Sequence, residues 1–237
     1  GEEKHFLQKA NRATSTLKAL VSDILHITKI NSGQLEMKKE YFWLDELILK
    51  CIETISMELK KKQEITLETD IEFISTKIYG YQTHILEIVI NLLSNAIKYT
   101  DTGFIKLKLK YKAADSTHAR IEFIVEDSGI GMTSDQLENI FSAYSRFKLD
   151  RQGLGLGLHI AKELSKKMNG ELLVQSEYGK GSRFTFGVDI EIDQNSNINI
   201  EGKKMTFLTN GKRSNMFKQE IDFLEKSGAI VNLFEDE

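Results

Sequence analysis

The stretch QTHILEIVINLLSNAIKY, residues 82–99, decides the fold of this chain. Apolar residues recur in it at steps of three and four, which is the period of one face of an α-helix. We therefore predict a helix over 82–99 with a buried apolar face, formed by Ile85, Ile88, Val89, Leu92 and Ala96.

The opposite face of this helix is unusually polar. Glu87, Asn91, Asn95 and Lys98 follow one another at steps of four, four and three, although asparagine is a poor residue inside a helix. An amide oxygen can coordinate Mg²⁺, which prefers oxygen ligands, and a lysine offsets phosphate charge. The pattern favours a ligand-binding face over the alternative, a polar face open to solvent.

Two glycine-rich turns follow further along the chain. Asp127-Ser-Gly-Ile-Gly131 comes directly after an apolar strand pattern, and Gly153-Leu-Gly-Leu-Gly157 leads into an amphipathic helix. Glycine lets backbone N–H groups approach phosphates, and a helix N-terminus favours an anion. The Asp127 carboxylate can accept a hydrogen bond from the exocyclic amine of adenine. Together with the polar helix face these turns predict a nucleotide pocket, although Asp-x-Gly-x-Gly by itself also occurs as a plain turn.

The segment 141–152 separates a short predicted helix from the second glycine turn. It carries several basic residues, among them Arg146. We interpret it as a mobile lid whose basic side chains meet the γ-phosphate on closure. A solvated loop is the alternative for any one of them.

Composition limits the classes of protein to consider. The 237 residues are 41% apolar and carry a net charge of −3, which suits a soluble globular chain and gives no long-range field for nucleic acid. The single cysteine, Cys51, fits a reducing compartment and a packing role. No apolar run reaches the roughly 18–20 residues that cross a bilayer, and the N-terminus lacks a signal-peptide pattern.

Alternating segments predict a sheet. They lie near 65–69, 104–111, 120–125, 171–175 and 182–186, and the middle two are consecutive without a helix between them. We therefore expect an α+β fold with a mixed, largely antiparallel sheet and helices on one face, among them a helix over 44–61. The lysines at alternate positions from Lys106 to Lys112 are interpreted as a solvated strand face, because no exposed aromatic residues interleave with them to stack bases.

The N-terminal segment predicts one long helix with a seam at heptad-like spacing, which Asn31-Ser-Gly33 ends. Additional apolar residues widen the stripe, which favours a four-helix bundle of two hairpins over a simple coiled coil, with an ordinary core helix as the alternative. The seam consists of Phe6, Ala10, Ala13, Leu17, Leu20, Ile24 and Ile27.

These motifs together resemble those of the sensor histidine kinases. Residues 91–100 (NLLSNAIKYT) resemble the N box, 127–132 (DSGIGM) the first glycine box and 140–146 (IFSAYSR) the phenylalanine box, and all occur in the family's order. Residues 153–158 (GLGLGL) resemble the second glycine box, and 179–184 (GKGSRF) the loop before the last strand. The resemblance covers roughly residues 6–190. It implies a Bergerat, GHKL-type ATP-binding α/β sandwich over 42–192.

The resemblance also implies roles for individual residues. Asn91 would bind Mg²⁺, Asp127 would read the adenine of ATP, Ser182 would assist Asp127 through water, and Glu87 holds the place of an acid/base residue. Arg146 would act with Glu87, Asn91 and Lys98 in catalysis. The remaining nucleotide contacts would come from Asn95, Lys98, Tyr99, Gly129, Gly131, Gly153, Gly155, Leu156 and Gly157.

Three departures from the family pattern stand out. Tyr81 takes the place of an aspartate before the N box, and Arg151-Gln152 replaces a threonine or serine before the second glycine box. Residues 1–33 resemble the second helix of the dimerisation hairpin, whereas the family's phosphoacceptor histidine lies on the first helix. The His-Glu-x-x-Thr-Pro motif around that histidine cannot occur here, because the chain has no proline. His5 and His26 are interpreted as structural or exposed, and His26 stands where the family usually carries an aspartate.

The C-terminal part predicts a linker over 193–202 and the start of a βαβ unit over 203–237, which resembles a degenerate receiver domain with Thr209 and Asn210 in place of its acidic pair. The resemblance implies that the chain is the cytoplasmic kinase core of a membrane-anchored hybrid sensor, which is a homodimer at full length. Its implied partners are a histidine-bearing hairpin and a receiver domain, because the chain lacks the acceptor histidine. Such a piece should not autophosphorylate alone. A nucleotide-binding pseudokinase or phosphorelay scaffold, a dimerisation module and an ATP hydrolase remain as alternatives.

Overall fold

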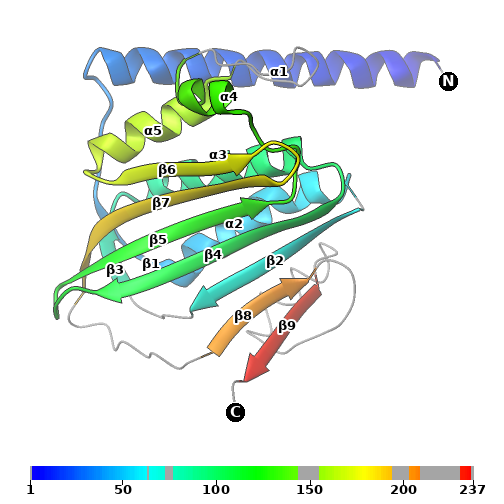
Figure 1. The fold of residues 1–237 in the computed structure, drawn as a ribbon. Coiled ribbons are helices and arrows are strands. Elements are labelled where there is room, and N and C mark those ends of the chain that lie inside the picture. Colours follow the sequence, from blue (N-terminus) through cyan, green and yellow to red (C-terminus); the bar gives the residue numbers. More distant parts are fainter. Residues whose placement is uncertain are drawn as a thin grey trace.

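The computed structural model describes residues 2–62, 64–72, 77–143, 155–193, 203–208 and 230–235. Figure 1 shows a twisted sheet with helices packed behind it and the long helix α1 running across one end. The helices are α1 (Glu2–Asn31), α2 (Leu44–Leu59), α3 (Gln82–Tyr99), α4 (Ser134–Asn139) and α5 (Gly157–Lys167). The strands are β1 (Glu40–Trp43), β2 (Ile65–Glu72), β3 (Lys77–Gly80), β4 (Gly103–Ala113), β5 (His118–Asp127), β6 (Glu171–Glu177), β7 (Gly181–Ile192), β8 (Lys203–Leu208) and β9 (Ile230–Glu235).

The sheet is mixed, as expected. Its strand order is β1-β3-β7-β5-β4-β2-β8-β9, with β6 also paired to β7. Strands β2 and β4 are parallel, whereas the other pairs are antiparallel. The hairpin of β4 and β5 confirms that the two consecutive strand patterns lie side by side.

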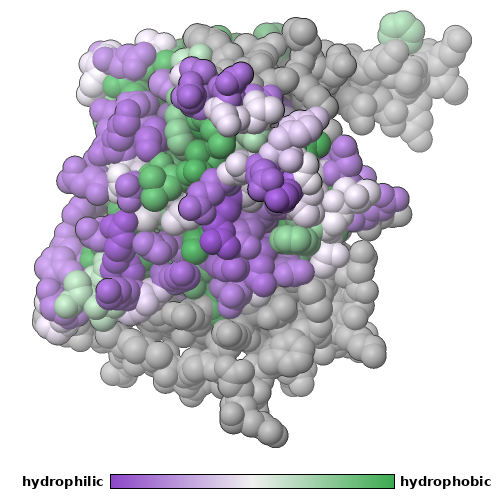
Figure 2. Space-filling model, viewed as in Figure 1, coloured by the Kyte–Doolittle hydropathy of each residue, from purple (hydrophilic) through white to green (hydrophobic). Residues whose placement is uncertain are grey.

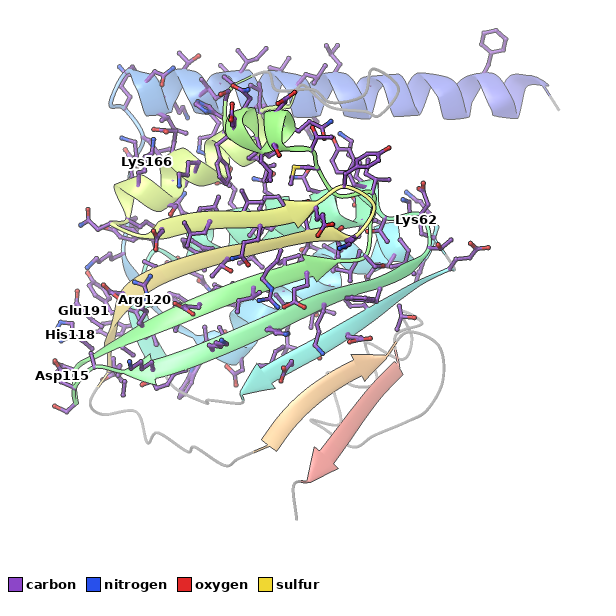
Figure 3. All side chains as sticks on the ribbon, in the orientation of Figure 1. Lys62, Asp115, His118, Arg120, Lys166 and Glu191 are labelled. Atoms are coloured by element: carbon purple, nitrogen blue, oxygen red, sulfur yellow. The ribbon has the colours of Figure 1, made fainter. Side chains whose placement is uncertain are left out.

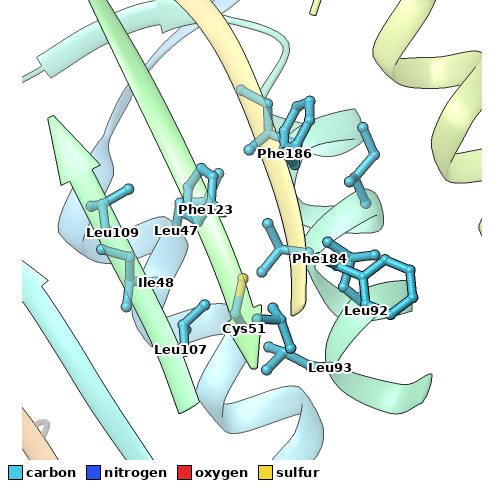
Figure 4. Packing of buried hydrophobic residues seen from close by; sticks show 14 of the residues in the cluster. Leu47, Ile48, Cys51, Leu92, Leu93, Leu107, Leu109, Phe123, Phe184 and Phe186 are labelled. Atoms are coloured by element: carbon cyan, nitrogen blue, oxygen red, sulfur yellow. The ribbon is translucent and has the colours of Figure 1, made fainter. Parts of the chain in front are cut away.

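Helices α2 and α3 pack on one face of the sheet and form the core with it (Figure 4). Leu47 and Cys51 of α2 and Leu92 of α3 are fully buried there, together with Phe123 and Phe186 of the sheet. Cys51 therefore has the packing role that its sequence context predicts, and burial raises the pKa of its thiol to about 12. This layer fixes α3 against the strands that carry the glycine turns.

The other face of the sheet is charged, and Figure 2 shows it as predominantly hydrophilic. On β4, Lys106 pairs with Glu68 at 3.3 Å and Lys108 pairs with Glu126 at 3.0 Å, while Arg183 of β7 also contacts Glu126 at 2.7 Å. The lysines thus belong to a mixed set of opposite charges. This arrangement agrees with a solvated face and gives no uniformly basic patch.

Helix α1 ends where the sequence predicts, since Gly33 takes a φ of +73° just beyond it. Its C-terminal part packs on the hydrophobic core through Ile30, which is buried, and Ile27, which is partly buried. By contrast, Val21, Ile24 and Leu25 are each about half exposed or more, at 49%, 48% and 57%. Part of the apolar stripe of α1 is therefore left open to a partner.

Two features of the sheet differ from the sequence-based predictions. Strands β1 and β3 were not predicted, because at four residues each they are too short for an alternating pattern to stand out. The predicted βαβ unit over 203–237 is wrong in its strand pairing: β8 and β9 are antiparallel, and β8 also adds antiparallel to the edge strand β2. The strands of a βαβ unit are parallel. Thr209 and Asn210 lie outside the described residues.

Candidate functional site

The polar face of α3 carries the predicted phosphate and metal residues. The side-chain amide of Asn95 donates to the backbone carbonyl of Asn91 at 2.9 Å, which holds these neighbouring turns together. The Oδ1 atom of Asn91 lies only 2.7 Å from the point where a Cβ would stand on Gly157, the first residue of α5. Gly157 thus lets the start of α5 approach Asn91, so that a helix N-terminus and an amide oxygen face the same place.

Lys98 and Tyr99 lie at the C-terminal end of α3. The Nζ atom of Lys98 is 5.1 Å from the centre of the Tyr99 ring. This end is held by Lys62, whose Nζ donates to the backbone carbonyls of Ile97 at 2.6 Å and Thr100 at 2.5 Å (Figure 3). Sequence reasoning missed Lys62, because it comes from the loop after α2 and only the packing of α2 on α3 brings it there.

Asp127 ends β5 and is only 7% exposed. Its Oδ1 accepts the backbone N–H of Gly129 at 2.9 Å. Burial raises the pKa of Asp127, while hydrogen bonds from the backbone N–H groups of Gly129 and Ser182 work against that rise. A buried carboxyl fixed by two backbone donors is a preorganised acceptor, which is what reading an amine group requires.

The glycines of the first box, predicted to give a ligand access, also serve backbone packing. A Cβ on Gly129 would stand 2.5 Å from the carbonyl oxygen of Tyr99 and 2.8 Å from Oδ1 of Asp127. At Gly131, whose φ is +61°, a Cβ would stand 2.0 Å from the carbonyl oxygen of Glu177. These close approaches bring the end of α3, the Asp127 turn and the loop between β6 and β7 into one place.

Ser182 and Thr100 contribute hydroxyl groups near Asp127. The hydroxyl of Ser182 lies 3.0 Å from that of Ser176, so the contact of Ser182 with Asp127 runs through its backbone N–H. Thr100 Oγ1 is buried without a hydrogen-bond partner in the described part of the chain, and it lies 2.9 Å from the position of a Cβ on Gly129. A water or ligand polar group there would satisfy it. Sequence reasoning quoted Thr100 within a motif but gave it no role.

Glu87 lies beside two imidazoles, one of which is within hydrogen-bond distance. Its Oε1 lies 2.9 Å from Nδ1 of His26 on α1, and its Oε2 lies 3.7 Å from Nδ1 of His84 on α3. The hydrogen bond to Glu87 raises the pKa of His26. Burial of Glu87 opposes ionisation, but the hydrogen bond and the charge of His26 lower the pKa of its carboxyl. His26, expected to be structural, thus holds a residue of the polar face.

The second glycine box and the lid are described only in part. Gly155 has a φ of +73°, and Leu156 is buried, so its backbone rather than its side chain faces outward at the start of α5. At the base of the lid, Phe141 is fixed by α5: its carbonyl lies 2.9 Å from Nδ1 of His159, and its ring lies 5.0 Å from Nζ of Lys162. The predicted ligands Arg146 and Gly153 lie outside the described residues.

The chain is similar to proteins of one known family. Residues 80–192 match the family described as "Histidine kinase-, DNA gyrase B-, and HSP90-like ATPase". The chain is 36% identical over 193 residues to the hybrid signal transduction histidine kinase B of Dictyostelium discoideum, covering 78% of this chain and 10% of that protein. Residues 80–192 form an ATP-binding domain of the sensor histidine kinase type.

Two further relatives extend this result. The autoinducer 2 sensor kinase/phosphatase LuxQ of Vibrio vulnificus is 31% identical over 224 residues, covering 92% of this chain and 25% of that protein. The crystal structure of full-length ShkA in complex with AMPPNP superimposes with a TM-score of 0.69 at 26% identity, over 81% of this chain and 40% of that one. The chain therefore has the GHKL ATPase fold with a mixed, curled sheet, and it spans about a tenth to a quarter of the length of these curated relatives.

The family assignment agrees with the resemblance that the motifs carried. The ATP-binding histidine kinase domain is confirmed, whereas the roles of single residues and the domain boundaries at 1–33, 42–192, 193–202 and 203–237 stay predictions. Among the described helices, none combines the length and the apolar character that a membrane crossing needs.

Proposed function

We propose that this chain binds ATP with Mg²⁺ and acts as the phosphoryl-donor half of a sensor histidine kinase. The observation that carries the proposal is Asp127, a buried carboxyl fixed by backbone donors where the end of α3 meets the Asp127 turn. Its remaining acceptor capacity suits the exocyclic amine of adenine. The buried hydroxyl of Thr100 beside Gly129, which has no hydrogen-bond partner in the described ranges, gives the same place a second polar group for a base or a bridging water.

The other end of the site suits phosphates and a hard cation. Asn91 offers an amide oxygen against the start of α5, which fits Mg²⁺ together with phosphate oxygens and water. Mg²⁺ supplies charge neutralisation on the phosphates. Asn95 and Lys98 contribute a donor amide and a positive charge, and the backbone N–H groups at Gly155 and Gly157 favour an anion. Arg146 and Gly153 complete this set as predictions.

In the reaction we propose, an imidazole nitrogen of the acceptor histidine forms a bond to the γ-phosphorus while the bond to the oxygen that bridges the β- and γ-phosphates breaks. ADP leaves, and the imidazole loses its proton to solvent or a nearby base. Positioning and charge stabilisation carry most of such a transfer. The acceptor histidine belongs to a dimerisation hairpin, and the phosphoryl group moves on to an aspartate of a receiver.

Binding of a fluorescent ATP analogue with and without Mg²⁺ tests the pocket. We expect Mg²⁺-dependent binding by the wild type and a loss of roughly 100-fold or more in Asp127→Asn, because the amide places a donor opposite the adenine amine. Asp189→Asn is the matched control, since Asp189 is exposed on the open face of the sheet and pairs with Arg120 at 3.2 Å. Equal affinity of Asp127→Asn and the wild type would show that the pocket is assigned wrongly.

Complementation separates the transferase from its alternatives. A separate helical hairpin that bears the acceptor histidine is added with labelled ATP. A kinase forms acid-labile phosphohistidine, a scaffold or pseudokinase binds ATP without doing so, and a hydrolase releases phosphate unaided. Hydrolysis needs Glu87 to activate water, and its Oε1 is already paired with Nδ1 of His26 at 2.9 Å. That observation favours transfer over hydrolysis.

The setting of the whole protein is part of the same proposal. A cytoplasmic kinase core in a hybrid, membrane-anchored sensor that forms a homodimer accounts for the likeness to hybrid histidine kinases and for the exposed stripe of α1. We expect no nucleic-acid partner, because Lys106 and Lys108 of the open sheet face are paired with acidic residues.

A further inference from the structure

Three side chains of metal-binding type meet where α1 crosses α3. His26 comes from α1, and His84 and Glu87 come from successive turns of α3. Their potential ligand atoms all lie within 4.8 Å of one another. None of the family motifs described above includes either histidine, and the transfer of phosphate does not use them.

The surroundings of His84 indicate which of its ring nitrogens is free to bind a metal. This side chain is only 8% exposed, and its Nε2 lies 3.2 Å from the backbone carbonyl oxygen of Glu36. A carbonyl oxygen only accepts hydrogen bonds, so in the neutral ring Nε2 carries the proton and Nδ1 carries the lone pair. An imidazole whose other N–H is donated to a backbone carbonyl is the arrangement usual for a metal-binding histidine.

The lone pair of His84 has no hydrogen-bond partner among the described residues and points toward a carboxylate. Nδ1 is buried and faces Oε2 of Glu87 at 3.7 Å. Two electron-rich atoms that face each other in a buried place repel, and a buried polar atom without a partner is costly. A cation bound between them would remove both costs.

The charge around this cluster suits a divalent ion. Glu87 contributes one negative charge, and Asp23, one turn before His26 on α1, adds a second carboxyl. Two neutral imidazoles and one carboxylate are a ligand set for Zn²⁺, whereas Mg²⁺ takes oxygen ligands. Neighbouring ligand atoms of a tetrahedral Zn²⁺ site lie about 3.3 Å apart. Side-chain rotations that move the ligand atoms by about 1–2 Å would therefore bring them to Zn²⁺-binding distances.

We propose that His26, His84 and Glu87 form a binding site for a transition-metal dication such as Zn²⁺, which fastens α1 to α3. The site is separate from the Mg²⁺ site at Asn91 and does not depend on the proposed function. Glu87 lies one helical turn before Asn91 on the same polar face. Occupation of the site would therefore fix both the orientation of α1 and the helix that presents the nucleotide ligands.

Titration of the chelator-treated chain with Co²⁺ tests the site directly, because the visible absorption of Co²⁺ reports bound nitrogen ligands, and Zn²⁺ is then added in competition. We expect one ion per chain and a loss of roughly 100-fold or more in affinity for both His26→Gln and His84→Gln. His118→Gln is the matched control: His118 also lies beside a carboxylate, with Nδ1 3.3 Å from Asp115, but on an exposed turn (Figure 3). It should bind Co²⁺ like the wild type.

A wild-type chain that binds no Co²⁺ or Zn²⁺, or histidine variants that bind as well as the wild type, would overturn the proposal. Since His84 is buried and its variant can lose its fold, the decisive variant is His26→Gln, whose melting temperature without metal serves as the check on folding. Zn²⁺ should raise the melting temperature of the wild type and not that of His26→Gln; equal shifts contradict the site. Asp127→Asn should keep Co²⁺ binding, which separates this proposal from the nucleotide pocket.

Discussion

At the scale of single residues, the first glycine box has a structural role besides the binding role that we propose for it. Gly129 and Gly131 allow three backbone segments to approach more closely than any side chain permits. Asp127 depends on this packing, because its carboxyl is fixed by the backbone N–H of Gly129. The glycines of the first box are therefore needed for folding, whatever they contribute to binding.

Gly131→Ala should be much more destabilising than Gly179→Ala. Both positions have positive φ, at +61° and +82°, so both variants pay about 1 kcal/mol for the left-handed conformation. At Gly131 the new methyl group also meets the carbonyl oxygen of Glu177, whereas nothing lies within 4 Å at Gly179. We expect a loss of about 3 kcal/mol or more at Gly131, measured by urea unfolding. Similar losses in both variants would mean that the close approach is not present in solution.

At the scale of elements, α3 is the helix on which the site depends, and both of its ends are held by other elements. Lys62, just beyond α2, hydrogen-bonds the carbonyls at the C-terminal end, next to Tyr99. His26 of α1 contacts Glu87 near the N-terminal end. The polar face between these contacts, with Asn91 and Asn95, is thereby fixed relative to the sheet.

Lys62→Met should lower the free energy of unfolding by about 1.5 kcal/mol, because a positive charge is removed from two buried carbonyls at a helix C-terminus. Lys166→Met is the control. Lys166 is exposed on α5 and pairs only with Glu163, at 2.7 Å in the described contacts, so its loss should cost less than about 0.5 kcal/mol. Denaturant unfolding of the two variants side by side makes the comparison. An equal loss of unfolding free energy in both variants would show that Lys62 does not cap α3.

The contact of α1 with α3 should depend on pH when metal is chelated. The pKa of His26 is raised from its ordinary 6.5, so its contribution to stability is complete below that value and is lost as the pH rises through the folded-state pKa. The pKa of Glu87 is lowered from 4.5, so its contribution is present above that value and is lost only at lower pH. The contact is therefore strongest between these two ordinary values and weakens in alkaline solution.

His26→Gln should accordingly cost up to about 1 kcal/mol at about pH 6, after allowance for solvent screening, and close to nothing at about pH 9. The measurement is the difference in unfolding free energy between wild type and variant at each pH, in the presence of chelator. His118→Gln, on its exposed turn, controls for general effects of a lost histidine. A difference that stays constant across this range, or grows toward alkaline pH, would contradict the ion pair.

At the scale of the whole molecule, the edge of the sheet at β2 is covered, whereas the apolar stripe of α1 is partly exposed. Strand β8 adds to the free edge of β2, which pairs backbone groups that would otherwise be exposed. Helix α1 has no comparable cover within the described residues: it packs through Ile27 and Ile30 but leaves Val21, Ile24 and Leu25 exposed. An exposed apolar stripe on a long helix is a surface for association.

We expect the chain to form dimers through α1. Val21→Asp should shift the chain toward the monomer, because a charge in an apolar helical seam is poorly tolerated. Ser22→Asp, at the adjacent exposed position, changes the charge equally and should leave association unchanged. Light scattering over a range of concentrations measures the effect. A wild type that stays monomeric at every concentration would contradict the prediction.

The sequence by itself determined the helix 82–99, the β4–β5 hairpin, the end of α1 and the ATP-binding class of the domain. These features depend on local periodicity, on glycine conformations and on motif order, which a chain carries in its own neighbouring residues. Only the tertiary structure decided that Lys62 caps α3, that His26 contacts Glu87, and that β8 and β9 are antiparallel. It also decided that the hydroxyl of Thr100 lies near Gly129 without a hydrogen-bond partner among the described residues. Three of these are contacts between residues that are distant in sequence, and one is the relative direction of two strands. Distant contacts and strand directions leave no periodic signal in the sequence, because the packing of helices and strands in three dimensions sets them.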